Sequence, residues 1–417
     1  MLAGPDRPRT DPIVRRSSMS GTGPTPIDVG IADGTRCTRP VRRIILTESN
    51  LREERVRYIG NKTKLVPFLL ETIDELDLAP GVACDPFAGT ASVGRALKTA
   101  GWRVHCGDLL AASYAYQVAR VELDRTPRYA GALSGGSASR RAMSYGAVLR
   151  VLEALPPGPG FVTEHYTPAG EDGREHGRMY FTPENGAAID AMRERISDWR
   201  REGLLDRAGT QLLLATLIQA ADRVANTTGV YASFVKTWQP NATRRIRLKP
   251  LRPTVPPASS ASGCTAFCGR AETLLGQAGP LDLLYLDPPY NERQYPGYYH
   301  LPELLAQGWE PPPELRGKTG LIPDDDLRSD WCRRGRCEAA LRSILDLADA
   351  RHVLLSYNDE GLLPRECIED AFRVSGDPDT FRVFTRGYRR YRSDSDGPGR
   401  QYRGDAVRER VYYVRKP

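Results

Sequence analysis

The sequence has few of the residues that bind metal ions or build a disulfide framework. Among its 417 residues there are 8 Cys and 5 His. The Cys pairs of CTAFC (264–268) and CRRGRC (332–337) lack the two-residue spacing typical of zinc sites, and no His pair accompanies them. We therefore expect reduced thiols and no metal site.

Long apolar runs are also missing. No stretch of about 18 apolar residues occurs, so we expect no membrane span. The first residues contain Arg and Pro but no apolar signal core, which favours a cytoplasmic protein over a secreted one. Because 40% of the residues are hydrophobic, a chain of this length can form a large core and two domains.

Lysine is scarce, whereas arginine is abundant. Of the 59 basic residues, 7 are Lys and 52 are Arg, and the net charge is +7. Arginine suits bidentate contacts with phosphate and guanine, although a GC-rich genome also encodes many of them. Residues 1–50 are rich in Pro, Thr, Ser, Gly and Arg without apolar periodicity, which predicts a disordered basic tail.

After this tail, helical and strand patterns alternate. Helical spacing covers 62–78, and the strand GVACDPF (81–87) follows. A helix then ends at Gly101, WRVHCGDL (102–109) is a second strand, and another helix follows it. This alternation predicts an α/β fold with a doubly wound, mainly parallel sheet.

The alternation is interrupted between 126 and 263. Loop-like segments occur there, together with two helices within 182–225 and a basic stretch, NATRRIRLKPLRP (241–253). We therefore expect a mostly helical insertion at 126–263 in an α/β domain formed by 51–125 and 264–417.

The sheet is expected to resume at LDLLYL (281–286) and to continue with RHVLLSYND (351–359). Two C-terminal segments alternate in polarity, TFRVFTRGYRRYR (380–392) and RERVYYVRKP (408–417). They predict an antiparallel pair that closes the sheet.

The sequence DPPY (287–290) follows the predicted buried strand LDLLYL. Proline cannot donate to a sheet ladder and has a fixed φ, so the two prolines end the strand in a stiff turn. Asp287 then lies at a strand carboxyl end, where ligands bind in open α/β sheets. A carboxylate, the Pro288 carbonyl and the face of Tyr290 suit a planar base with an exocyclic amine. Taken alone, the four residues could equally be a proline-rich loop with a solvated acid.

A second ligand-binding pattern lies nearer the N-terminus. CDPFAGTASVG (84–94) follows a strand and opens a helix, so backbone N–H groups can approach a ligand. Asp108 ends the next strand about 20 residues after the glycine turn, where an acid binds ribose hydroxyls in related folds. A helix cap is the alternative role for Asp108.

These motifs resemble those of the α-group DNA adenine-N6 methyltransferases, which include Dam-type enzymes and type II restriction-modification methylases. RYIGNKTKL (57–65) is similar to their N-terminal cofactor motif, DPFAGTASVG (85–94) to their glycine loop, and DPPYNERQY (287–295) to their catalytic motif. Their order is that of the α group, and the resemblance covers most of 55–415. One departure is Ala91, where the family often has a second glycine.

The resemblance implies roles for individual residues. Asp287 is the catalytic acid, the Pro288 carbonyl is a second acceptor for the amine, and Tyr290 stacks on a flipped adenine. The implied contacts to the cofactor S-adenosyl-L-methionine are Tyr58, Lys62, Asp85, Phe87, Gly89, Asp108 and Asp287. The reaction needs no metal, because positioning and electrostatics suffice to aim the amine at a methyl group.

The insertion corresponds to the target recognition domain of the family. Four basic residues in six, Arg244, Arg245, Arg247 and Lys249, are the candidate DNA contacts because no acid lies near them in the sequence. On an extended segment, Arg245 and Arg247 should share a face and Arg244 should lie on the other. The Arg-Tyr pairs of the C-terminal hairpin could hold DNA or form a charged solvent face. We expect His300 to be structural.

The sequence therefore predicts a site-specific, S-adenosyl-L-methionine-dependent methyltransferase for the N6 amine of adenine in double-stranded DNA. Its expected setting is the bacterial cytoplasm, in restriction-modification with a cognate endonuclease or in genome marking. One alternative is another exocyclic amine, either adenine in RNA or cytosine N4 in DNA. The other alternative is a non-catalytic DNA-binding subunit with the same fold.

Overall fold

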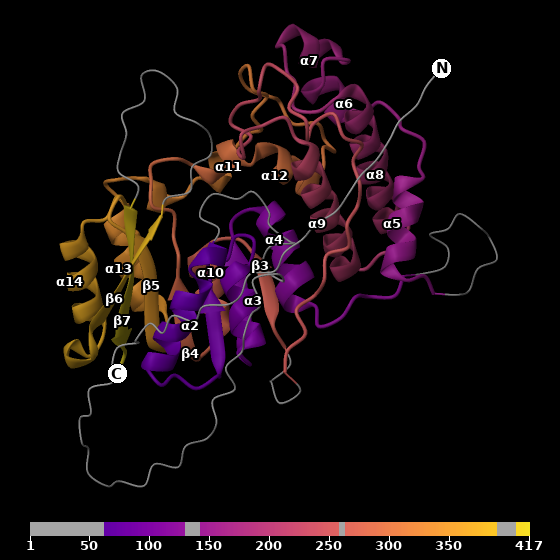
Figure 1. Ribbon diagram of the computed structural model, residues 1–417. Coiled ribbons are helices and arrows are strands. Elements are labelled where there is room, and N and C mark those ends of the chain that lie inside the picture. The colour runs from indigo at the N-terminus through magenta and orange to yellow at the C-terminus, as the bar shows by residue number, and fades with distance from the viewer. Residues whose placement is uncertain (1–61, 130–141, 258–262, 390–405) are drawn as a thin grey trace, which may run out of the picture. The chain divides into compact units, whose positions relative to one another are not determined.

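A computed structural model describes residues 62–129, 142–257, 263–389 and 406–417. The predicted tail at 1–50 and Tyr58 lie outside these residues. Within them, seven strands form one sheet in the order β3-β2-β1-β4-β5-β7-β6 (Figure 1). The strands are β1 (Val82–Asp85), β2 (Arg103–Asp108), β3 (Thr265–Cys268), β4 (Leu281–Leu286), β5 (Ala350–Asn358), β6 (Arg382–Arg389) and β7 (Ala406–Arg415).

Five of these strands are parallel, and β7 runs antiparallel between β5 and β6. The predicted antiparallel closing pair is thus confirmed, with Leu355 of β5 opposite Tyr412 and Phe384 of β6 opposite Val411. Strand β3 was not predicted, because TAFC is only four residues long and none of them is buried. Short, half-exposed edge strands lack the apolar run that marks a central strand.

Helices cover both faces of the sheet, which confirms the doubly wound α/β fold. On β4, Leu284 and Leu286 pack with one group of helices, while Leu283 and Tyr285 pack with the other. The first group is α10 (Ala271–Ala278), α13 (Cys337–Leu347) and α14 (Arg365–Ser375). The second group is α2 (Val66–Glu75) and α3 (Ser92–Thr99). This alternation along one strand is the period of two that a sheet imposes.

The predicted insertion is helical in the part that the structure describes. Its helices are α5 (Tyr145–Glu153), α6 (Phe161–Tyr166), α7 (Glu171–Glu175), α8 (Pro183–Arg201) and α9 (Arg207–Val224). Helix α8 begins as predicted, with the Thr182 side chain accepting from the Asn185 N–H and Pro183 in the first turn.

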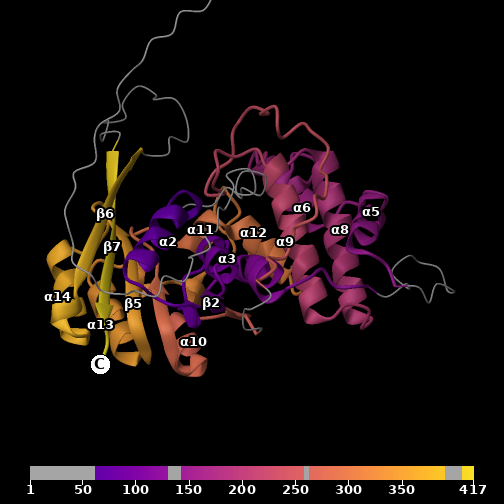
Figure 2. The same ribbon diagram turned by 60° about the horizontal axis from the view of Figure 1, so that its bottom comes forward.

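Helices α5, α6, α8 and α9 share a hydrophobic core with two helices outside 126–263. One is α4 (Ala111–Gln117), which continues into a π-helical turn at Val118–Glu122, and the other is α12 (His300–Gln307). Helix α12 follows the short α11 (Tyr295–Tyr298) and lies beside α9 in both views (Figures 1 and 2). The insertion therefore packs directly on the elements that follow β2 and β4.

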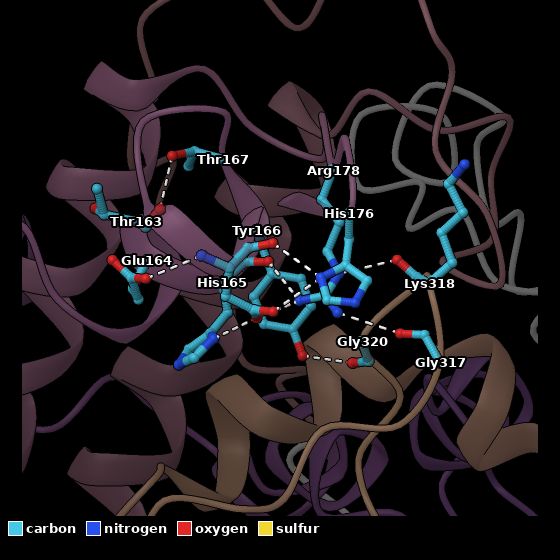
Figure 3. A network of polar contacts seen from close by, with 11 residues as sticks. Thr163, Glu164, His165, Tyr166, Thr167, His176, Arg178, Gly317, Lys318 and Gly320 are labelled. Atoms are coloured by element: carbon cyan, nitrogen blue, oxygen red, sulfur yellow. Dashed lines mark hydrogen bonds and ion pairs between the residues drawn. The ribbon is translucent and has the colours of Figure 1, made fainter. Parts of the chain in front are cut away.

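Arg178 connects the insertion by hydrogen bonds to a turn near residue 318 (Figure 3). Its buried guanidinium donates to the carbonyls of Lys318, at 2.9 Å, and Gly317, at 3.2 Å. It also donates to the carbonyl of His165 and to the carboxylate of Asp172, at 3.0 and 2.5 Å. One side chain thus satisfies acceptors from two distant segments.

Replacing Arg178 with Met is expected to lower the free energy of unfolding by about 2–5 kcal/mol, because buried carbonyls and a carboxylate would lose their donor. Urea denaturation of the full chain measures this. The matched control is Arg174→Met, since Arg174 is exposed on the neighbouring helix α7. Equal unfolding midpoints for the two variants would show that the Arg178 network does not stabilise the fold.

Candidate active site

The predicted motif residues meet at the carboxyl ends of β1, β2 and β4. A cavity of about 380 Å³ lies there. The sequence-predicted residues that line it are Lys62, Asp85, Phe87, Gly89, Asp108, Asp287, Pro288 and Tyr290. Motifs that are more than 200 residues apart in the chain therefore form one site.

Lys62, which lines this cavity, is bound by two carboxylates. Its Nζ lies 3.0 Å from Asp287 Oδ1 and 2.8 Å from Glu409 Oε1. The ammonium also contacts the Tyr290 hydroxyl and lies 4.4 Å from the centre of that ring. The Tyr290 hydroxyl in turn donates to Asp287 Oδ1 at 2.5 Å. The four side chains form one buried polar cluster.

Burial sets the proton affinities in this cluster. It raises the pKa of Asp287 to about 6, although the ammonium of Lys62 and the Tyr290 hydroxyl act in the opposite direction. Burial alone would lower the pKa of Lys62, but the charges of Asp287 and Glu409 outweigh it and raise that pKa. Burial, followed by the charge of Asp287, raises the pKa of Tyr290 well above its usual range. At neutral pH the cluster therefore holds a charged lysine, a protonated tyrosine and an ionised Asp287.

Asp108 lies at the end of β2 and faces the glycine loop. It accepts from the N–H groups of Gly89, at 3.0 Å, and Leu110, at 2.9 Å. Burial raises its pKa to about 6, and these hydrogen bonds counteract part of that effect. Asp108 thus holds the backbone of the loop and lines the cavity. It does not cap the next helix, because the N-cap of α4 is Leu110 and has no side-chain cap hydrogen bond.

The glycine loop contains left-handed backbone at two positions. Gly89 has φ +49° and Ala91 has φ +63°, immediately before α3. A Cβ makes this conformation unfavourable by roughly 1 kcal/mol, so glycine is the usual choice. The loop adopts the turn even with alanine at 91, whose side chain is fully buried.

Tyr290 is held from both sides by a segment that the motif does not include. Its ring packs edge-on against Tyr357 of β5, with ring centres 4.9 Å apart. Its carbonyl accepts from the N–H of Leu362, and the Tyr357 hydroxyl accepts from the N–H of Leu363. The segment SYNDEGLLP (356–364), which contains the end of β5 and the residues after it, thus fixes the ring proposed to stack on a base.

Two residues of the site were not predicted: Trp331, which lines the cavity, and Glu409, which contacts Lys62 and Tyr290. Glu409 is buried on β7, and Trp331 packs edge-on against Phe87 with ring centres 5.2 Å apart. An acid in the apolar alternation RERVYYV was a visible signal for Glu409, because it falls on the inward face of the strand. Trp331 belongs to a single 3-10 turn at Asp330–Cys332, and no pattern in the sequence placed it at the cavity.

The basic stretch of the insertion lies on the surface. Arg245, Arg247 and Lys249 are exposed and alternate with buried Ile246 and Leu248, as an extended segment requires.

The expectation that Arg244 lies on the opposite face is wrong, because it ends a turn and is exposed as well. No acid lies near this stretch in the sequence, but the fold brings one to it. Glu153 of α5 lies 3.6 Å from the Arg247 guanidinium.

His300 is fully buried, and burial lowers its pKa to about 4. Its neutral ring donates from Nε2 to the Tyr231 carbonyl at 2.8 Å and packs among tyrosines, which favours the structural role. Across the described ranges, no group of three or more His, Cys, Asp or Glu side chains is placed to hold a metal ion. Nor does any helix there have the length and apolar character to cross a membrane.

Comparison with known proteins matches residues 58–365 to the D12 class N6 adenine-specific DNA methyltransferases. The type II methyltransferase M.NlaIII of Neisseria lactamica is 33% identical over 364 residues, which cover 87% of this chain and 99% of that protein. M.FokI of Planomicrobium okeanokoites is 32% identical, and the match covers 87% of this chain and 53% of M.FokI. Modification methylase StsI of Streptococcus sanguinis is 30% identical, with 87% and 52% covered. The chain thus spans about half the length of the last two relatives, and it belongs to the D12 class N6 adenine-specific DNA methyltransferases.

Proposed function

We propose that this chain transfers a methyl group from S-adenosyl-L-methionine to the N6 amine of adenine in double-stranded DNA. The observation that carries the proposal is the joint position of Asp287, Pro288 and Tyr290 at the end of β4. They line the same cavity as the glycine loop and Asp108. The residues proposed to bind the base and the loop proposed to bind the nucleoside therefore line the same cavity.

The residues of this cavity fit the proposed cofactor. Asp108 can accept from ribose hydroxyls, and the loop from Asp85 to Gly89 offers backbone close to the methionine part. Phe87 and Trp331 supply apolar wall. S-adenosyl-L-methionine, when bound, would supply an electrophilic methyl group on a sulfonium.

Asp287 and the Pro288 carbonyl would each accept one N–H of the adenine amine. The lone pair of that amine is delocalised into the ring, and two hydrogen bonds to acceptors localise it on nitrogen. Positive charge develops on nitrogen as the new bond forms, and ionised Asp287 stabilises it. Asp287 is also placed to take the proton that the methylated amine releases. Tyr290 would stack on the base once it has left the duplex.

Two further assignments belong to this proposal. The insertion at 126–263 would select the target sequence, with Arg244, Arg245, Arg247 and Lys249 as candidate contacts to DNA. A cognate restriction endonuclease would be the biological partner if the chain protects host DNA, as the names of its type II relatives suggest.

Identification of the methylated nucleoside tests the proposal. Duplex DNA is incubated with the full chain and cofactor carrying a labelled methyl group, then digested and separated. Labelled N6-methyl-2′-deoxyadenosine from DNA is expected. Label in N4-methylcytosine, or only in RNA offered as competitor, would replace the proposed substrate, and no label in any nucleic acid would favour a non-catalytic subunit.

Asp108→Asn is expected to weaken cofactor binding by about tenfold or more, because hydrogen bonds to a charged acceptor are the stronger kind. Calorimetric titration with S-adenosyl-L-methionine measures this. Affinity for duplex DNA should stay within about twofold, and a thermal melt controls for loss of the loop structure. Unchanged cofactor affinity in a folded variant would place the ribose elsewhere.

Arg245→Ala is expected to weaken binding to specific and random duplexes equally and to lower the slope of log K against log salt by roughly one unit. Arg245 is preferred to Arg247 because the latter already has Glu153 beside it. Arg373→Ala on α14 is the control, since that exposed residue lies on the opposite end of the sheet. A wild-type slope for Arg245→Ala would remove this residue from the DNA interface.

A further inference from the structure

Glu409 is a buried carboxylate that none of the motifs includes. It lies on β7, opposite Asn358 of β5 and Arg386 of β6, and its side chain is 1% exposed. A buried charge is unfavourable by several kcal/mol unless it is paired and hydrogen-bonded. Strand pairing alone does not require an acid there, so its contacts should indicate why it is there.

Every described partner of Asp287 Oδ1 is also a neighbour of Glu409. Lys62 Nζ is 3.0 Å from Asp287 Oδ1 and 2.8 Å from Glu409 Oε1. The Tyr290 hydroxyl is 2.5 Å from the first oxygen and 3.1 Å from the second. Each donor therefore has a second acceptor within hydrogen-bond distance.

This arrangement matters because an amine must also bind Asp287. An incoming N–H competes with Lys62 and Tyr290 for the same carboxylate. If Glu409 were absent, an ammonium displaced from Asp287 would lose its acceptor inside a buried site. With Glu409 in place, both donors can remain hydrogen-bonded while Asp287 turns to the amine.

The charges lead to the same conclusion. Lys62 alone would neutralise Asp287 and reduce the attraction between that carboxylate and a nitrogen that becomes positive. A second carboxylate leaves the cluster with a net negative charge, which favours developing positive charge in a low-dielectric site.

We propose that Glu409 is a positioning residue, the counter-ion that holds Lys62 and the Tyr290 hydroxyl so that Asp287 is free to bind the target amine. This inference rests on the proposed function. It gives Glu409 no contact with the substrate, and it makes the negative charge of its side chain, rather than its volume, the property that matters.

The proposal predicts a shift in the acid limb of the pH profile, which is the range of low pH over which the transfer rate falls from its plateau. The titratable groups that face Asp287 are Lys62, Glu409, Tyr290, Tyr285, Tyr295 and Asp85. Glu409 raises the pKa of Asp287, whereas Lys62 lowers it. Glu409→Gln removes the like charge and keeps the opposite one, so Asp287 should protonate at lower pH and also bind Lys62 more tightly.

The experiment measures single-turnover methylation against pH, with DNA and cofactor saturating, for the full-length wild type, E409Q, K62M and the double variant. E409Q should lose on the order of 10- to 100-fold of the plateau rate, less than loss of a direct transition-state contact. Its acid limb should move to lower pH. In K62M/E409Q part of the plateau should return, because the uncompensated ammonium has gone.

The control is E303Q. Glu303 is equally buried but accepts from the N–H groups of Ala111 and Ala112 at 2.9 Å, so its loss should leave the acid limb in place. NMR titration of the Asp287 carboxyl carbon supplies a readout that needs no turnover. It should report a lower pKa in E409Q than in wild type.

A wild-type plateau and limb in E409Q would overturn the proposal. The proposal would also be overturned if E409Q were slower but its acid limb and the Asp287 titration were those of wild type, and if adding K62M did not restore the rate. That pattern would mean that Glu409 acts through packing alone. Should E409Q not fold, E409D keeps the charge and is expected to keep the acid limb of wild type. Wild-type enzyme that methylates no adenine would refute the proposed function instead, and the Asp287 titration would still decide the role of Glu409.

Discussion

Asp287→Asn is expected to reduce methyl transfer by more than about 1,000-fold while the chain stays folded, since a preorganised charge at the reacting atom is the largest single contribution in such sites. The substitution keeps the shape and one acceptor but removes the negative charge. It also leaves Glu409 as the remaining carboxylate for Lys62, so the cluster should not collapse. Single-turnover rates with saturating DNA and cofactor measure the effect, and turnover near that of wild type would refute the assignment.

The same residue sets the pH dependence. Burial raises the pKa of Asp287 to about 6, and the ionised form is the one that accepts the amine N–H. The transfer rate should therefore be full above this pKa and fall as pH drops through about 6. Asp108 titrates in the same range, also because of burial, so cofactor affinity should weaken there too. Measuring the rate at saturating cofactor separates the titration of Asp287 from that of Asp108. The residual rate of Asp287→Asn should not fall as pH drops through about 6.

Strand ends were predictable because their pattern is local. Apolar runs followed by Asp85, Asp108 and Asp287 mark three strand ends, and parallel topology places such ends on one edge of the sheet. The cavity unites all three acids. Strand β3 escaped prediction because edge strands need no continuous apolar run. The central parallel strands and their acidic ends thus followed from local signals, whereas the edge strand β3 did not.

Contacts between distant segments could not be predicted. Glu409 and Tyr290 are 119 residues apart, and nothing local relates them. The pairing of Arg247 with Glu153 likewise depends on where α5 packs. Helix α12 shows the same limit on a larger scale, since its apolar face completes the core of an insertion that ends far before it. The sequence analysis did not predict this helix or its place in that core.

Replacement of Tyr290 separates two functions of one side chain. Its face is proposed to stack on adenine, which is worth about 1–3 kcal/mol, so Tyr290→Ala should lose roughly 10- to 100-fold in rate. Its hydroxyl bonds Asp287 at 2.5 Å, so Tyr290→Phe removes that bond and keeps the face. We expect a loss of less than about tenfold for Phe, the cost of a typical buried hydrogen bond.

Tyr290→Trp should keep substantial activity, because a larger π face still stacks. Since Tyr357 and the segment after β5 hold the ring, the order of single-turnover rates should be wild type, Phe and Trp, then Ala. If Trp is as slow as Ala while Phe is fast, a tight fit rather than stacking governs the site. If Phe is as slow as Ala, the hydroxyl governs it. The second result would make the link from Tyr290 to Asp287 and Glu409 more important for transfer than the ring itself.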